Sequence, residues 1–223
     1  ASSTTITSSH RLGLPTPGAA YPTELYYGAG MELYGSPAVK NWEISNNNIS
    51  NMNAGIYTWL DNPSPGATIN INSNTLSAAN PDPFFASYTT DQYMLQGIEA
   101  SSAASVTATH TLNINNNSMT KVFNGIFFNG LKASKTAVQN NHINLWDYTA
   151  SSPNPQYGIQ VNQSLDAQVS SNDISTPTLG AVLYADRMNG VYAAFNTNLK
   201  VCDNRTTKIG RGFSFDQDRK SVV

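Results

Sequence analysis

A short pattern with an asparagine at a fixed place recurs six times along this 223-residue chain. Each copy reads apolar, any residue, apolar, two polar residues, Asn, any residue, apolar. The six copies are centred on Asn47, Asn74, Asn117, Asn141, Asn172 and Asn204. The steps between these asparagines are 27, 43, 24, 31 and 32 residues. A unit of this size is too small to bury its own apolar face, so successive copies are predicted to stack on one another.

A second element, a glycine followed by alternating residues, lies between the copies. It begins at Gly30, Gly55, Gly97, Gly125, Gly158, Gly190 and Gly212. Alternation over four or five residues predicts short, half-buried strands. The glycine in front of each strand is expected to supply a turn with unrestricted φ. Helix is a poor alternative, because the apolar spacing is two and Asn, Ser, Thr and Gly favour turns over helix interiors.

The repeated asparagine has a structural interpretation. Ile44 and Ile49 are five residues apart, and continuous strand alternation would send them to opposite faces. A turn between them returns both to the interior, and Asn is the residue other than Gly that best tolerates the left-handed conformation of such a bend. Its side chain can also bond to the equivalent Asn of the next copy, which predicts an internal ladder of amides. All six asparagines are therefore interpreted as structural.

The Gly-Ile-x-apolar strand followed by apolar-x-x-Asn-x-apolar resembles the coil repeat of right-handed parallel β-helix proteins, the pectin-lyase-like superfamily. The resemblance covers residues 30–216 and implies an all-β fold: a right-handed single-stranded parallel β-helix, a solenoid of about six to seven coils with loop insertions. Residues 1–29 are then an irregular N-terminal stretch or an incomplete first coil. Residues 217–223 are interpreted as a non-native or disordered tail, and the chain as a fragment of a larger bacterial protein.

The outward face of the glycine-led strands supplies the candidate site. If the residue after each glycine points inward, then Glu32, Tyr57, Glu99, Phe127, Gln160 and Tyr192 form one outward column. The next outward positions are Tyr34, Trp59, Ser101, Asn129 and Asn162. The surface formed by these two sets of residues is rich in aromatic side chains, which indicates contact with another molecule.

Aromatic side chains of this kind suit the apolar faces of sugar rings. The substrate-binding candidates are Tyr34, Tyr57, Trp59, Phe127, Tyr192 and Trp146, the last at the start of a proline-containing loop that extends to Gln156. In the alternative interpretation, these aromatics only pack loops onto the scaffold.

In enzymes that this chain resembles, the substrate groove lies along one such strand face, so the carboxylates there are the candidate catalytic residues. Glu32 and Glu99 flank Tyr57 two strands apart, which gives an expected separation of about 9.6 Å, near the upper limit for an inverting glycosidase pair. Two solvated glutamates on a sheet face are the alternative.

Other kinds of chemistry find little support in the sequence. A net charge of −2 argues against nucleic acid as a partner, and no apolar run approaches the length of a membrane span. None of His10, His110 and His142 has another His or Cys at ligand spacing, so no metal site is predicted. His142 is expected to face outward beside the ladder. No cofactor is expected, with calcium considered only for a lyase, which the resemblance implies would use acidic residues to hold the ion.

Three functions are compatible with the sequence. The leading one is a secreted or cell-surface β-helix scaffold for which polysaccharide is the candidate partner, without catalysis by this segment. The alternatives are a polysaccharide lyase or glycoside hydrolase acting on the outward strand face, and a trimeric rod like a tailspike or adhesin. The expected location is extracellular or at the cell surface, and the oligomeric state is left open.

Overall fold

The computed structural model describes residues 5–7, 29–35, 41–50, 52, 54–60, 66–78, 94–102, 110–129, 134–146, 155–177 and 188–216. All regular elements in these ranges are β-strands, and the sheets are parallel. No helix among these residues has the length and apolar character needed to cross a bilayer. Apart from residues 5–7 and 29, the predicted N-terminal stretch lies outside the described residues, as do most of the predicted loop from Trp146 to Gln156 and the whole C-terminal tail, residues 217–223.

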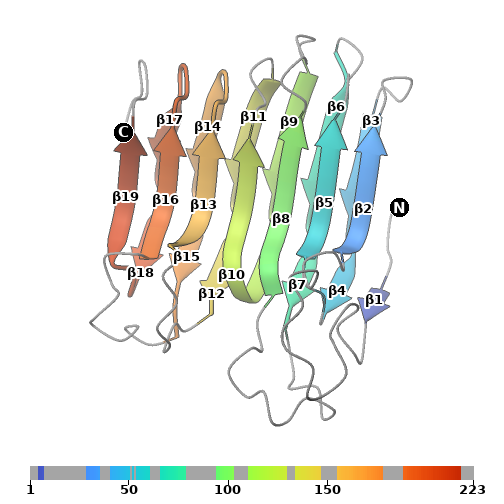
Figure 1. Cartoon of the computed structure of the whole chain (residues 1–223), viewed down its shortest axis with the longest axis horizontal. Coiled ribbons are helices and arrows are strands. Elements are labelled where there is room, and N and C mark those ends of the chain that lie inside the picture. Colours follow the sequence, from blue (N-terminus) through green and yellow to red (C-terminus); the bar gives the residue numbers. More distant parts are fainter. Residues whose placement is uncertain are drawn as a thin grey trace, which may run out of the picture.

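Long strands that begin near the repeated glycines form one row, in which each strand pairs with the next in parallel (Figure 1). They are β2 (Ala29–Gly35), β5 (Ala54–Leu60), β8 (Met94–Ser102), β10 (Ser118–Asn129), β13 (Gln156–Asn162), β16 (Met188–Ala194) and β19 (Arg211–Asp216). The predicted alternating segments are therefore strands.

Short strands form a second row, and all but the first of them directly follow a repeated asparagine. They are β1 (Thr5–Thr7), β4 (Asn48–Ser50), β7 (Thr75–Ser77), the first part of β10, β12 (His142–Leu145), β15 (Asp173–Ser175) and β18 (Arg205–Thr207). Because β10 belongs to both rows, the two rows form one 13-stranded sheet in the described part of the chain. The register of β10 shifts between Thr120 and Val122, where its short part bends into its long part.

A smaller, six-stranded sheet is built from the strands that precede the asparagines. Its members are β3 (Asn41–Ser45), β6 (Thr68–Asn72), β9 (His110–Asn115), β11 (Ser134–Gln139), β14 (Ala167–Ser170) and β17 (Lys200–Cys202). We use "repeat" for one strand of this smaller sheet with the short and long strands that follow it, such as β3, β4 and β5. Each strand pairs with its equivalents in neighbouring repeats, an arrangement compatible with a parallel β-helix.

The core lies between the strands of each repeat and continues from one repeat to the next. In the repeat of β3, β4 and β5, the inward side chains are Ile44, Ile49 and Ile56, each no more than 2% exposed. They belong to one continuous cluster with the equivalent Ile, Leu, Val and Met residues of the other repeats. Burial of that shared apolar surface is the main stabilising contribution to the stack.

The bend between the smaller sheet and the short strands differs in one detail from the prediction. The left-handed residue is the one before the repeated asparagine, and not the asparagine itself. These residues are Asn46, Ser73, Asn116, Asn140, Ser171 and Asp203, with φ between 55° and 58°. Two neighbouring residues thus share the work of each corner. The first adopts the left-handed conformation that makes the bend, and the repeated asparagine after it turns its side chain inward and forms the hydrogen bonds.

The predicted amide ladder is present and links six repeats. At its centre, the backbone N–H and Nδ2 of Asn117 donate to Oδ1 of Asn141 over 2.9 and 3.0 Å. The same Nδ2 donates to the carbonyl oxygen of Ile71 in the preceding repeat, and Oδ1 of Asn117 accepts from Asn74. The pattern runs from Asn47 to Asn204, and the first five members are 1% exposed. Each internal amide thereby satisfies its buried donors and acceptor.

The repeated glycines act through close packing, which corrects the expectation that they provide turns. None of the seven has a positive φ. A Cβ added to Gly55 or Gly97 would lie 2.6 Å from the carbonyl oxygen of the next glycine in the column, Gly97 or Gly125. The absence of a side chain lets the backbones of successive repeats approach where the short strand bends into the long one.

Replacing an internal ladder asparagine is expected to destabilise the stack strongly. Asn117→Ala leaves the backbone N–H of Asn74 and the carbonyl oxygen of Ile71 without their partners in a buried corner. We expect a loss of about 3 kcal/mol in the free energy of unfolding, measured by urea denaturation. The control, Asn113→Ala, removes one half-buried bond to Asn70 on the outer face of the smaller sheet and should cost less than about 1 kcal/mol. Equal losses in the two variants would contradict the ladder's role.

A methyl group in the glycine column is expected to separate neighbouring repeats. In Gly97→Ala the new Cβ meets the Gly125 carbonyl oxygen and, at 2.7 Å, the sulfur of Met119. The backbone contact cannot be relieved by a side-chain rotation, so we expect a loss of about 1–3 kcal/mol in the same unfolding measurement. A variant as stable as the parent would show that the glycines are not needed for close approach.

Candidate functional site

Two outward columns on the long strands form the candidate site, and the register places every residue predicted for them. Along the first column, Glu32 pairs with Tyr57, Tyr57 with Glu99, Glu99 with Phe127, Phe127 with Gln160, and Gln160 with Tyr192. Along the second column, the order is Tyr34, Trp59, Ser101, Asn129 and Asn162. We call the surface made by these columns the long-strand face.

Strand alternation presents these side chains away from the core. In β5, Ile56 and Thr58 are buried, whereas Tyr57 and Trp59 between them are half-buried. The buried glycine and isoleucine at the start of the strand are consecutive, because the chain bends there around the corner of the repeat. From that point on, period-two alternation fixes which side chains reach the long-strand face.

An acidic and aromatic group occupies one end of the long-strand face. Tyr57 lies between Glu32 and Glu99 on three neighbouring strands, so the two carboxylates keep the predicted separation of two strands. The Tyr34 and Tyr57 rings pack with their centroids 6.0 Å apart. Tyr34 is 64% exposed, which leaves most of its side chain available to a second molecule.

The surroundings of Tyr57 keep its phenol protonated. Burial is the main cause, followed by the negative charge of Glu99, and together with Tyr34 and Glu32 they raise the pKa of Tyr57 to about 12. The usual pKa of a tyrosine is about 10, so this higher pKa means that the Tyr57 hydroxyl remains a neutral hydrogen-bond donor at physiological pH. Tyr57 is therefore suited to contact an uncharged oxygen of a ligand.

Glu99 is the more enclosed of the two carboxylates. Burial raises the pKa of Glu99, while a hydrogen bond that Ser101 Oγ donates to Oε1 over 3.3 Å lowers it by a smaller amount. A raised pKa moves a carboxyl group toward the protonated state that a general acid needs. Glu32 is exposed, so the two carboxylates have different environments.

A second aromatic pair lies toward the other end of the face and includes a residue that was not predicted. The Tyr157 and Tyr192 rings have centroids 5.2 Å apart. Tyr157 directly precedes Gly158, and its backbone N–H donates to Oδ1 of Asn124, which directly precedes Gly125. Its place directly before a repeated glycine was the signal in the sequence that could have identified Tyr157 as a member of this face.

Trp146 does not belong to the outward columns. It follows the last residue of β12, where its backbone N–H donates to the carbonyl oxygen of Val122 and its own carbonyl oxygen accepts from Nε2 of Gln156. Its side chain is half-buried. The structure thus brings together five of the six aromatic binding candidates along one face, and Trp146 lies beside the corner between short and long strands.

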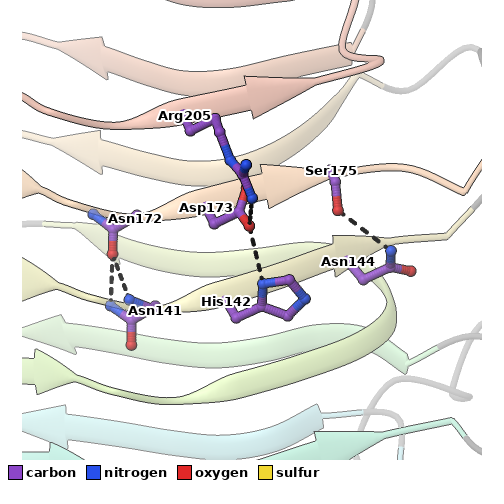
Figure 2. A network of polar contacts seen from close by, with 7 residues as sticks. All are labelled: Asn141, His142, Asn144, Asn172, Asp173, Ser175 and Arg205. Carbon is purple, nitrogen blue, oxygen red and sulfur yellow. Dashed lines mark hydrogen bonds and ion pairs between the residues drawn. The ribbon is translucent and has the colours of Figure 1, made fainter.

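A separate polar row lies on the outside of the short strands, one residue after the ladder asparagines (Figure 2). Arg205 Nε donates to Oδ1 of Asp173 over 3.0 Å, and Nδ1 of His142 lies 3.3 Å from Oδ2 of the same carboxylate. The hydrogen bond from Arg205 is the main reason that the pKa of Asp173 is lowered. His142 faces outward beside the ladder, as predicted. Because all three groups are solvent-accessible, this row is expected to contribute little to stability.

The chemistry available on the long-strand face is aromatic stacking, hydrogen bonding by amides and acid–base chemistry by carboxylates. Among the described residues, no group of three or more His, Cys, Asp or Glu side chains is placed to hold a metal ion.

Comparison with known proteins finds no matching family, no matching curated protein and no matching solved structure.

Glu99→Gln is expected to change how stability depends on pH. Because the folded-state pKa of Glu99 is raised, folding binds a proton between the unfolded and folded pKa values, and the parent loses stability as pH rises through that window. The glutamine variant lacks this loss. Its urea midpoint should exceed that of the parent at pH 7, and the difference should shrink below about pH 4, near the ordinary pKa of Glu. A variant less stable than the parent at pH 7 would contradict the desolvation of Glu99.

Proposed function

We propose that this chain is a segment of a right-handed parallel β-helix like those of the pectin-lyase-like superfamily, and that it serves as a stiff scaffold whose long-strand face contacts polysaccharide. The proposed setting is outside the cell or on its surface, as part of a larger bacterial protein. The observation that carries the functional part is the alignment of aromatic, amide and carboxylate side chains in columns across successive strands.

The solenoid interpretation is supported by the way equivalent elements stack. Long strands pair with long strands, short with short, and the strands of the smaller sheet with one another. The amide ladder passes through the same corner of every repeat from Asn47 to Asn204. A chain that winds once per repeat accounts for both features.

Contact with polysaccharide is supported by the types of side chain on the long-strand face. Tyr34 comes from β2, Tyr57 and Trp59 come from β5, and Phe127 comes from β10, while Tyr157 with Tyr192 continues the surface farther along. Aromatic rings offer an apolar face to a sugar, while tyrosine hydroxyls and neighbouring amides bond to its oxygens. A polymer can lie across several strands and meet one of these groups at each.

A polysaccharide lyase or glycoside hydrolase is the second candidate, favoured by one observation. Glu99 has a raised pKa and shares its column with Glu32 two strands away. That spacing of about 9.6 Å is near the limit for an inverting pair, in which one carboxyl group donates a proton and the other activates water. A trimeric rod is less favoured, because these carboxylates interrupt the apolar surface that such an interface needs.

Removing one aromatic side chain from the long-strand face tests the scaffold proposal. On a glycan array, Trp59→Ala should bind its polysaccharide about tenfold more weakly than the parent, because a stacking contact is lost. The control is Phe195→Ala, which removes a 53% exposed ring from the turn after β16 and not from an outward column, and should bind as the parent does.

Assays for new reducing ends and for unsaturated products, run on the same polysaccharides, separate the two candidates. Binding without turnover supports the scaffold. Release of reducing ends that Glu99→Gln abolishes would favour the hydrolase, and formation of double bonds would favour the lyase.

A further inference from the structure

Charge is distributed unevenly over the long-strand face. Two of its outward residues are carboxylates, Glu32 and Glu99, on strands that flank β5. In the described part of the chain, the outward positions from β2 to β16 include no Lys or Arg, and the first basic one is Arg211 at the start of β19. Lys121, in the bend of β10, precedes the first outward position of that strand.

The middle of the face is uncharged and rich in amides. Phe127 is followed in its column by Gln160, and beside them Asn129 pairs with Asn162. Side-chain amides both donate and accept hydrogen bonds, so they match sugar hydroxyl groups, which do the same.

From this arrangement we infer that the long-strand face binds a neutral polysaccharide and discriminates against polyuronates. The inference rests on the proposed contact with polysaccharide and names the class of polymer. The aromatic rings stack on uncharged sugar rings, the amides of Gln160, Asn129 and Asn162 bond to hydroxyl groups, and the protonated phenol of Tyr57 donates to a sugar oxygen.

The two carboxylates supply the discrimination. A uronate chain carries one carboxylate per sugar, and lying over Tyr57 it would bring negative charges next to Glu32 and Glu99 with no cation on the neighbouring outward positions to pair with them. Like charges at such distances repel, and the repulsion weakens as salt is added. A neutral chain meets no such repulsion.

Affinity electrophoresis of the whole chain in native gels measures both classes of polymer directly. The gels contain either a neutral polymer (glucan, xylan or mannan) or a polyuronate (polygalacturonate or alginate), at low salt. We expect retardation by at least one neutral polymer, with an apparent Kd at least tenfold lower than for either polyuronate. Polyuronate binding as tight as neutral binding would overturn this inference and leave the contact with polysaccharide standing. Binding to neither class would overturn both.

Charge variants test the reason for the discrimination. The double variant Glu32→Gln with Glu99→Gln should increase affinity for polygalacturonate at least threefold at low salt, and the gain should fall as salt is added. The matched control is Glu43→Gln, which changes one charge in the smaller sheet, where Glu43 Oε2 accepts from Asn70, and should give no gain. A gain in the control as large, per charge removed, as that of the double variant would mean that net charge alone is responsible, and would overturn the assignment to Glu32 and Glu99.

Discussion

The amides of the first five ladder asparagines occupy a buried corner where hydrogen bonds to water are not available to the backbone. Asn117 is 1% exposed, and its side chain replaces water for groups in the repeats on both sides, from Ile71 to Asn141. A carbonyl oxygen or N–H left unpaired in such a corner is costly. This requirement fixes the rotational position of one repeat on the next, because the amides bond only when their corners coincide.

That constraint determines the register of the rest of the stack. Once the corners coincide, the glycine column can pack backbone against backbone, as between Gly97 and Gly125. The inward isoleucines then stack in the core, and the outward residues align in columns. The surface chemistry of the long-strand face is a consequence of an internal hydrogen-bond ladder, since a shift of one residue would send every outward side chain to the core.

The arrangement of the face also explains how one scaffold can offer distinct environments to residues of the same type. Glu32 lies on the strand β2 and is exposed, whereas Glu99 is partly enclosed, two strands farther along. The two glutamates occupy the same column but differ in burial. The free energy needed to ionise each carboxyl group differs as a result. Position along the stack therefore tunes residues that occupy equivalent places in the repeat.

The sequence by itself determined the all-β class, the six ladder asparagines and the two outward columns, because strand alternation and a recurring residue are one-dimensional patterns that the backbone converts directly into faces. Only the tertiary structure decided that the left-handed residue is Asn46 and not Asn47, that the glycines are needed for close approach, and that Tyr157 packs on Tyr192. It also decided the enclosure of Glu99 and the pairing of Asp173 with Arg205. These features depend on distances and desolvation between segments about 30 residues apart, and no local pattern encodes how closely two such segments approach.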